Sequence, residues 1–153
     1  MRTFTDVSEL VAATGEHLGY SEWHPIDQRR IELFADATDD HQWIHVDEQK
    51  AAAGPFGSTI AHGFLTLSMI SALLPEVYSV GNLAMGMNYG ANKIRYLNPV
   101  RVNDRIRLGL RLVDTVQTPK GVQTVNEVTI EIEGQERPAL VAEILLLMVP
   151  AQA

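Results

Sequence analysis

Cysteine is absent from the 153 residues of the chain. Disulfides, thiolate nucleophiles and cysteine-ligated metals are therefore excluded. A chain without cysteine is typical of a reducing compartment, and residues 1–10 lack the apolar run of a signal peptide. These two absences together predict a cytoplasmic protein.

Long apolar runs and an excess of positive charge are also lacking. The longest apolar stretches, residues 63–75 and 139–150, fall short of the roughly 20 residues that a membrane-spanning helix needs. The formal net charge is −7, whereas binding to nucleic acid requires a basic surface that neutralises phosphates. Neither a membrane nor a nucleic acid is therefore expected as a partner.

The composition is that of an ordinary globular protein, with 46% hydrophobic and 20% charged residues. No internal repeat, low-complexity tract or Gly/Ser linker divides the chain. We therefore expect a single domain over residues 1–153.

The first half of the sequence alternates short helical and extended patterns. A strand is expected over residues 20–26, and Asp27 then offers an N-cap for a helix that ends at the polar Asp39-Asp40 pair. The other expected elements are a short helix over residues 7–14, closed by Gly15, and a helical turn over residues 47–53 that precedes an irregular loop. The helix after Asp27 should thus deliver Asp40 at its C-terminal end.

A helix over residues 63–74 is apolar nearly all round, which predicts burial on most of its faces, and Pro75 is expected to end it. The sequence then turns to strand patterns at residues 83–97, 104–116, 122–133 and 139–149, with Gly86 and Gly90 as possible bulges in the first of them. A buried helix followed by a long antiparallel meander predicts an α+β fold in which the sheet wraps around the helix.

Residues 34–47 bring Asp40, His41, His45 and Asp47 together beside an apolar helical pattern. If Asp40 and His45 converge, a carboxylate and an imidazole can share a water for general acid-base chemistry. Spacing alone favours the alternative, a helix-end aspartate and a structural histidine. A metal site would need a helix through residues 42–44 to bring His41 and His45 together, and no third histidine is close in sequence, so no metal is expected.

His62 and Gly63 open the apolar helix, where free backbone N–H groups could stabilise a developing oxyanion. The alternative is that His62 only caps the helix and Gly63 only permits close packing. Ser71 lies two helical turns further along and can share a face with Gly63. Asn88 and Tyr89, beside Gly90, could line a pocket or mark a bulged strand edge.

Two segments carry a resemblance to a known family. The run Asp-His-Gln-Trp-Ile-His-Val-Asp at residues 40–47, followed by Ile-Ala-His-Gly-Phe-Leu at residues 60–65, resembles the hydratase motif of the MaoC-like, (R)-specific enoyl-CoA hydratase family. The similarity is greatest to the nodulation protein N-like branch and covers residues 20–149. The usual Asn-Pro between the two catalytic residues is replaced here by Gln42-Trp43, which bears on loop shape and substrate fit.

The resemblance implies a hot-dog fold, with an antiparallel sheet around a long helix and two copies forming a homodimer. By the same resemblance, Asp40 and His45 correspond to the catalytic pair that holds the reacting water. The N–H of Gly63 corresponds to the donor to the thioester carbonyl, and Ser71 to a serine that assists in the active site. His62, Asn88 and Tyr89 are added to the substrate-binding candidates.

The implied reaction is the reversible syn addition of water to a trans-2-enoyl-CoA, which gives an (R)-3-hydroxyacyl-CoA in fatty-acid metabolism. The acyl-CoA thioester is the expected partner, and no cofactor is expected. Two alternatives stay open: a hot-dog thioesterase that directs water at the carbonyl carbon, and a non-catalytic acyl-binding subunit. Acyl chain length and the choice between CoA and acyl carrier protein are not fixed by the sequence.

Overall fold

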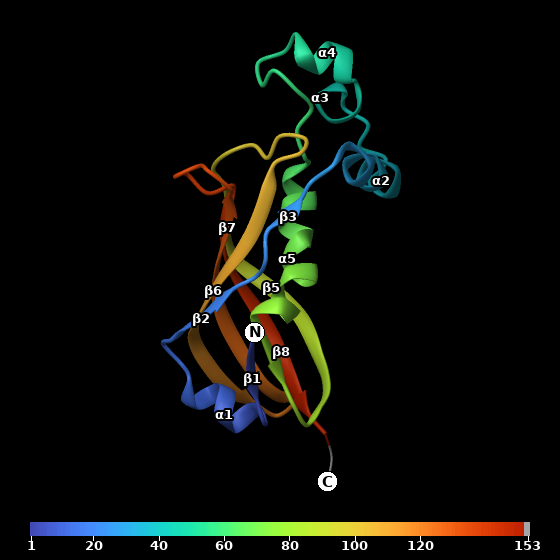
Figure 1. The fold of residues 1–153 in the computed structure, drawn as a ribbon. Helices are drawn as coiled ribbons and strands as arrows, with labels where there is room; N and C mark the ends of the chain where they lie inside the picture. Colours follow the sequence, from blue (N-terminus) through green and yellow to red (C-terminus); the bar gives the residue numbers. More distant parts are fainter. Residues whose placement is uncertain (152–153) are drawn as a thin grey trace.

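The computed structural model describes residues 1–151, and Figure 1 shows the path of the chain. The helices are α1 (Val7–Ala12), α2 (Gln28–Thr38), α3 (Trp43–Val46), α4 (Glu48–Ala52) and α5 (Gly63–Val77). The strands are β1 (Arg2–Phe4), β2 (His17–Tyr20), β3 (His24–Pro25), β4 (Tyr78–Val80), β5 (Leu83–Tyr96), β6 (Arg105–Thr118), β7 (Gly121–Ile132) and β8 (Leu140–Pro150).

An antiparallel sheet packs against α5, as the α+β prediction requires. Its strands follow the order β2-β6-β7-β8-β5, and β3 also pairs with β6. Alternate residues of the central strands point inward, so Leu108, Ile130 and Leu140 are fully buried. Figure 1 shows the curved sheet on one side of α5, with α2, α3 and α4 gathered beyond its N-terminal end. The hot-dog arrangement is therefore confirmed.

Helix α5 begins at Gly63 as predicted, but it runs through Pro75 to Val77, so Pro75 does not end it. A proline in the last turn removes one hydrogen bond, to the carbonyl of Ser71, and exposed Ser71 leaves that carbonyl near water.

The prediction that α5 is buried on most faces is also wrong for a single chain. The sheet and the preceding segments cover Leu65, Thr66, Met69, Ile70, Leu73 and Val77. The opposite side carries the exposed residues Phe64, Ser68, Ser71, Ala72 and Pro75. One curved sheet reaches around only part of a helix, and the rest of α5 stays open.

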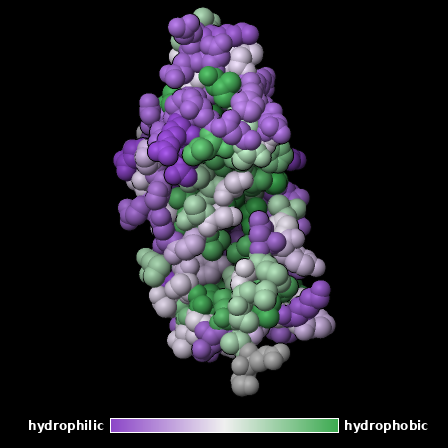
Figure 2. All heavy atoms as spheres, turned by 90° about the vertical axis from the view of Figure 1, so that its right-hand side faces the viewer, coloured by the Kyte–Doolittle hydropathy of each residue, from purple (hydrophilic) through white to green (hydrophobic). Residues whose placement is uncertain are grey.

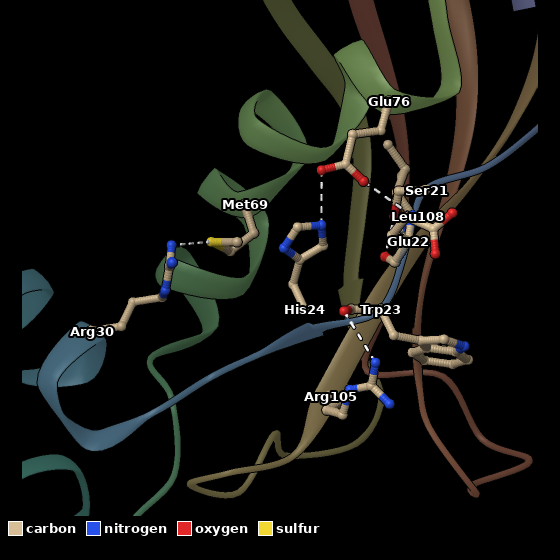
Figure 3. Close-up of polar contacts among 9 residues, drawn as sticks. All are labelled: Ser21, Glu22, Trp23, His24, Arg30, Met69, Glu76, Arg105 and Leu108. Atoms are coloured by element: carbon tan, nitrogen blue, oxygen red, sulfur yellow. Dashed lines mark hydrogen bonds and ion pairs between the residues drawn. The ribbon is translucent and has the colours of Figure 1, made fainter. Parts of the chain in front are cut away.

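The strand expected over residues 20–26 is interrupted at residues 21–23, which connect β2 to β3, and both short strands pair with β6. Figure 3 shows how Glu76 of α5 contacts this connecting segment. A carboxylate oxygen of Glu76 accepts the backbone N–H of Glu22 at 3.0 Å, and the other oxygen lies 2.8 Å from Nε2 of His24. These contacts hold the segment that connects β2 to β3 against the C-terminal end of α5.

The possible bulges in β5 and the helical turn after residue 46 are two further predictions from the sequence. The pairing of β5 with β8 shifts register between Asn88 and Gly90, which confirms the bulge at Gly90, whereas it is regular at Gly86. The helical turn expected over residues 47–53 is confirmed as α4. Within residues 1–151, no helix is both long and apolar enough to cross a membrane.

Candidate active site

The end of α2 places Asp40. The side chain of Asp27 caps the helix by accepting the N–H of Arg30 at 2.8 Å. At the other end, Asp39 adopts a left-handed conformation with φ of 57°, which stops the helix and turns the chain. Asp40 is thus delivered at the C-terminal end of α2, as predicted, and it is exposed there.

His45 lies on α3, a helical turn that the sequence did not predict, and only 6% of it is exposed. Its Nδ1 donates to the carbonyl oxygen of Ile60 at 2.7 Å. A carbonyl can only accept, so Nδ1 carries the hydrogen and the neutral ring keeps its lone pair on Nε2. In return, the N–H of Ile60 donates to the carbonyl of Ile44 at 3.0 Å, which ties α3 to the segment that leads into α5.

His62 joins the two halves of the site. Its Nε2 donates to the backbone carbonyl of Asp40 at 2.9 Å, and its ring stacks on that of His45 with centroids 3.7 Å apart. The ring of Phe34 packs against it with a centroid distance of 5.0 Å. A carboxylate oxygen of Asp40 and one ring nitrogen each of His45 and His62 therefore lie within 4.8 Å of one another.

Burial lowers the pKa of His45 below its usual 6.5, and the nearby His62 lowers it further. The hydrogen bond to Ile60 and the charge of Asp40 oppose these effects without reversing them. His45 is therefore neutral at pH 7, and its Nε2 can accept a proton.

Gly63 begins α5 directly beside this group and is exposed. The first N–H groups of a helix have no partner within the helix and lie at the positive end of its dipole. A side chain at this position would place Cβ 3.1 Å from the ring of Tyr96, tighter than ordinary contact. The two residues share a cleft of about 280 Å³, so a small ligand group can approach the helix N-terminus.

Ser71, Asn88 and Tyr89 lie elsewhere, in a groove of about 560 Å³ between α5 and β5. Ser71 is about 12 Å along the helix from Gly63, as expected from the rise per residue. The remaining lining is mainly apolar and includes Leu67, Leu74, Met87, Ile144 and Leu146. Figure 2 shows apolar atoms gathered along the middle of this hollowed face. The structure thus divides the predicted residues between a polar centre and an apolar groove.

The hypothetical metal site built on His41 gains no support. His41 lies outside the cluster, since its Nε2 contacts a carboxylate oxygen of Asp36 at 2.9 Å, which raises the pKa of His41. The stacked rings of His45 and His62 are only 23° apart in plane. Nδ1 of His45 and Nε2 of His62 already contact backbone carbonyl oxygens. The arrangement suits proton transfer better.

Two parts of the site had no signal in the sequence. Ile60 acts through its backbone carbonyl, which no side-chain pattern encodes. Tyr96 covers Gly63, but one tyrosine at the end of a strand is common and predicts no particular contact.

Comparison with known proteins places the chain in a family. Residues 9–134 match the model of the MaoC like domain. The chain is 50% identical over 144 residues to 3-hydroxyacyl-thioester dehydratase Z of Mycobacterium tuberculosis, an alignment that covers 94% of this chain and 95% of the relative. It is 44% identical over 139 residues to Nodulation protein N of Rhizobium leguminosarum bv. viciae, covering 89% of this chain and 86% of that protein.

Solved structures agree on the fold. The R-hydratase PhaJ1 from Pseudomonas aeruginosa, in its unliganded form, superimposes with a TM-score of 0.73 at 23% identity, covering 91% of this chain and 83% of the other. The family model and the sequence relatives make the assignment. The chain belongs to the MaoC-like dehydratase domain family and is a hydro-lyase of the hydratase and dehydratase type.

Proposed function

We propose that the protein catalyses the reversible hydration of a trans-2-enoyl-CoA to an (R)-3-hydroxyacyl-CoA. The observation that carries this proposal is the meeting of the Asp40 carboxylate, the neutral His45 imidazole and the α5 N-terminus at Gly63. The M. tuberculosis relative, named as a 3-hydroxyacyl-thioester dehydratase, supports this class of substrate.

In the hydration direction, the thioester oxygen accepts the N–H of Gly63 while a water lies between Asp40 and His45. The water oxygen bonds to the β-carbon, and one of the two side chains takes a proton from it. The electron pair of the double bond moves toward the carbonyl, where Gly63 stabilises the enolate-like charge. The same proton then passes from the side chain to the α-carbon on the same side of the substrate. The addition is therefore syn, and the side chain returns to its starting protonation state. These groups supply all of the acid-base chemistry, and we propose no cofactor.

The groove between α5 and β5 can accommodate the acyl chain of the substrate. Gly63, Leu67, Ser71 and Leu74 recur at helical spacing along the side of α5 that faces β5. A chain whose thioester oxygen lies at Gly63 can follow this side into the apolar groove, where Asn88 and Tyr89 form part of the opposite wall. The groove therefore favours an acyl thioester over a small polar substrate. We also propose a cytoplasmic location, on the basis of the cysteine-free sequence.

The absorbance of the conjugated enoyl thioester tests the proposal directly. Mixing the protein with crotonyl-CoA, and with a longer 2-enoyl-CoA, should remove this absorbance and give the (R)-alcohol on chiral analysis. Release of free thiol from a saturated acyl-CoA would instead indicate the thioesterase. Tight binding without turnover would indicate a non-catalytic acyl-binding subunit, and either result would overturn the proposed hydration.

The pH dependence of the reaction should follow His45. Because the folded-state pKa of His45 is lowered from 6.5, the neutral side chain should persist as the pH falls to 6.5. We therefore expect protonation of His45 to lower kcat/KM only below pH 6.5. The unfolded chain binds more protons than the folded chain between the two pKa values, so this contribution to the free energy of unfolding is full above pH 6.5 and declines as the pH falls through the folded-state pKa.

Rate profiles from pH 5 to 8 and urea titrations at both ends of that range would measure the two effects. His45→Gln should weaken the pH dependence of stability in the acid part of the range. An acid limb of kcat/KM centred above pH 6.5 would contradict the assignment.

We further propose that two copies of the chain pair through β5. This 14-residue strand lies at the edge of the sheet and is exposed over most of its length. Met85 and Tyr89 on β5 are 50% and 60% exposed, and Phe64 on the open face of α5 is 68% exposed. A long, apolar strand edge beside an uncovered helix face is a surface that proteins normally pair or cover. A second copy would complete both features by two-fold symmetry.

Met85→Lys combined with Met87→Lys should convert the dimer to a monomer, because two added charges would be buried where the copies meet. Light scattering coupled to size exclusion would measure the mass. Val113→Lys, which adds the same charge at an exposed apolar residue of β6, is the matched control and should leave the dimer unchanged. A dimer that persists in the double variant would place the interface elsewhere.

A further inference from the structure

Gln28, the first residue of α2, reaches across to the segment that carries His45. Its Nε2 donates to the backbone carbonyl of His45 at 2.9 Å. Its Oε1 accepts the hydroxyl of Thr59 at 2.6 Å. One side chain therefore links the start of α2, the turn that carries His45 and the segment that leads into α5.

The carbonyl of His45 fixes which way the Gln28 amide faces. A carbonyl oxygen can only accept, so it must meet the NH2 group, and this leaves the amide oxygen to accept the hydroxyl of Thr59. Thr59 is only 1% exposed, so water cannot easily replace its hydroxyl. The pair thus forms a clamp, defined here as Gln28 and Thr59, with a single hydrogen-bonded orientation.

The turn that carries His45 needs such support. Helix α3 has four residues, and a helix this short has little stability of its own. The bonds at Ile60 hold one side of α3, through the ring of His45 and the carbonyl of Ile44. The clamp holds the backbone carbonyl of His45. Together these contacts fix both the backbone and the ring, and with them the direction of the Nε2 lone pair.

We propose that Gln28, held in place by Thr59, is a positioning residue that aims His45 at the reacting water. Gln28 acts through the backbone of His45 and does not touch the substrate. This inference rests on the proposed role of His45 in hydration. It assigns catalytic importance to an amide that carries no charge and takes no part in proton transfer.

Gln28→Leu removes both hydrogen bonds and keeps a similar side-chain volume. We expect kcat to fall about 10- to 100-fold, because small misplacements of a catalytic group have effects of this size. KM should change little, since the substrate contacts remain. Thr59→Val should lower kcat by a smaller factor, and Thr59→Ser, which keeps the hydroxyl, should restore it. Gln49→Leu, the same change at an exposed position of α4, is the matched control.

The two members of the clamp should act as one unit. The Gln28→Leu/Thr59→Val double variant should therefore be no slower than Gln28→Leu alone. Thermal unfolding identifies variants that have lost structure generally. Equal losses of kcat in Thr59→Ser and Thr59→Val would overturn the inference, because only the latter breaks the clamp.

The imidazole resonances of His45 provide a readout that does not depend on activity. When the clamp is broken, α3 should loosen and admit water, so the pKa of His45 should move upward toward 6.5 in Gln28→Leu but not in Gln49→Leu. An unchanged titration together with an unchanged kcat would reject the positioning role. If the unaltered protein hydrates no enoyl thioester, the proposed function fails, and the titration still decides whether Gln28 positions His45.

Discussion

Replacing Asp40 with Asn should lower turnover of an enoyl thioester by about 10²- to 10⁴-fold, the usual contribution of a general acid or base. Asparagine keeps the size and polarity of aspartate but cannot take a proton from water. Asp40 is exposed; its backbone carbonyl accepts from His62, and its side chain accepts the N–H of Gln42 at a long 3.4 Å. Steady-state rates with crotonyl-CoA, beside circular dichroism of both proteins, would measure the loss with the fold intact.

His45→Gln should cause a loss of the same order, with some loss of stability. The ring is buried and hydrogen-bonded to Ile60, and a poorly replaced bond at a buried site costs about 1–3 kcal/mol of the free energy of unfolding. Asp40→Asn is therefore the cleaner variant. Residues that act as a unit give non-additive losses, so the double variant should be little slower than the worse single one. Near-native turnover in the double variant would reject the catalytic pair.

The parts of the site that the sequence predicts are those with local signals. Asp27 is an N-cap residue, and the Asp39-Asp40 pair interrupts an apolar helical pattern, so the end of α2 could be placed from neighbouring residues alone. The start of α5 at Gly63 follows from the same logic, because a polar His-Gly pair precedes a long apolar run.

What the sequence does not predict depends on contacts between distant segments. His62 stacks on His45 across a loop, and Gln28 bonds the carbonyl of His45 from another helix. Neither pair of residues is related by a helical or strand spacing, so no sequence pattern predicts these contacts. The open face of α5 has a similar origin: hydropathy predicts that an apolar helix is buried, but it does not say whether the cover comes from the same chain. The interruption between β2 and β3 is of the same kind, because the N–H of Glu22 donates to Glu76, which lies 54 residues further along the chain.

Gly63→Pro tests the oxyanion role with the least disturbance to the helix. Proline is favoured at the first position of a helix, where the N–H is not needed for helical bonding. The residue before a proline prefers extended backbone, and His62 already has φ of −58° and ψ of 141°. The substitution therefore removes the N–H proposed to bind the thioester oxygen and leaves α5 in place. We expect kcat to fall about 10²- to 10³-fold, as when a single oxyanion donor is lost.

Gly63→Ala separates the lost donor from crowding. Both variants add a Cβ that would lie 3.1 Å from the ring of Tyr96, but alanine keeps its N–H. Alanine should therefore lose only the part of the activity that depends on space around Tyr96, and proline should lose much more. Rates measured with the same enoyl thioester would compare the two losses of activity, and far-UV circular dichroism would check that both proteins keep their helices. Equal losses in the two variants would assign the effect to crowding and remove Gly63 from the proposed mechanism, because the backbone N–H is the group that only proline eliminates.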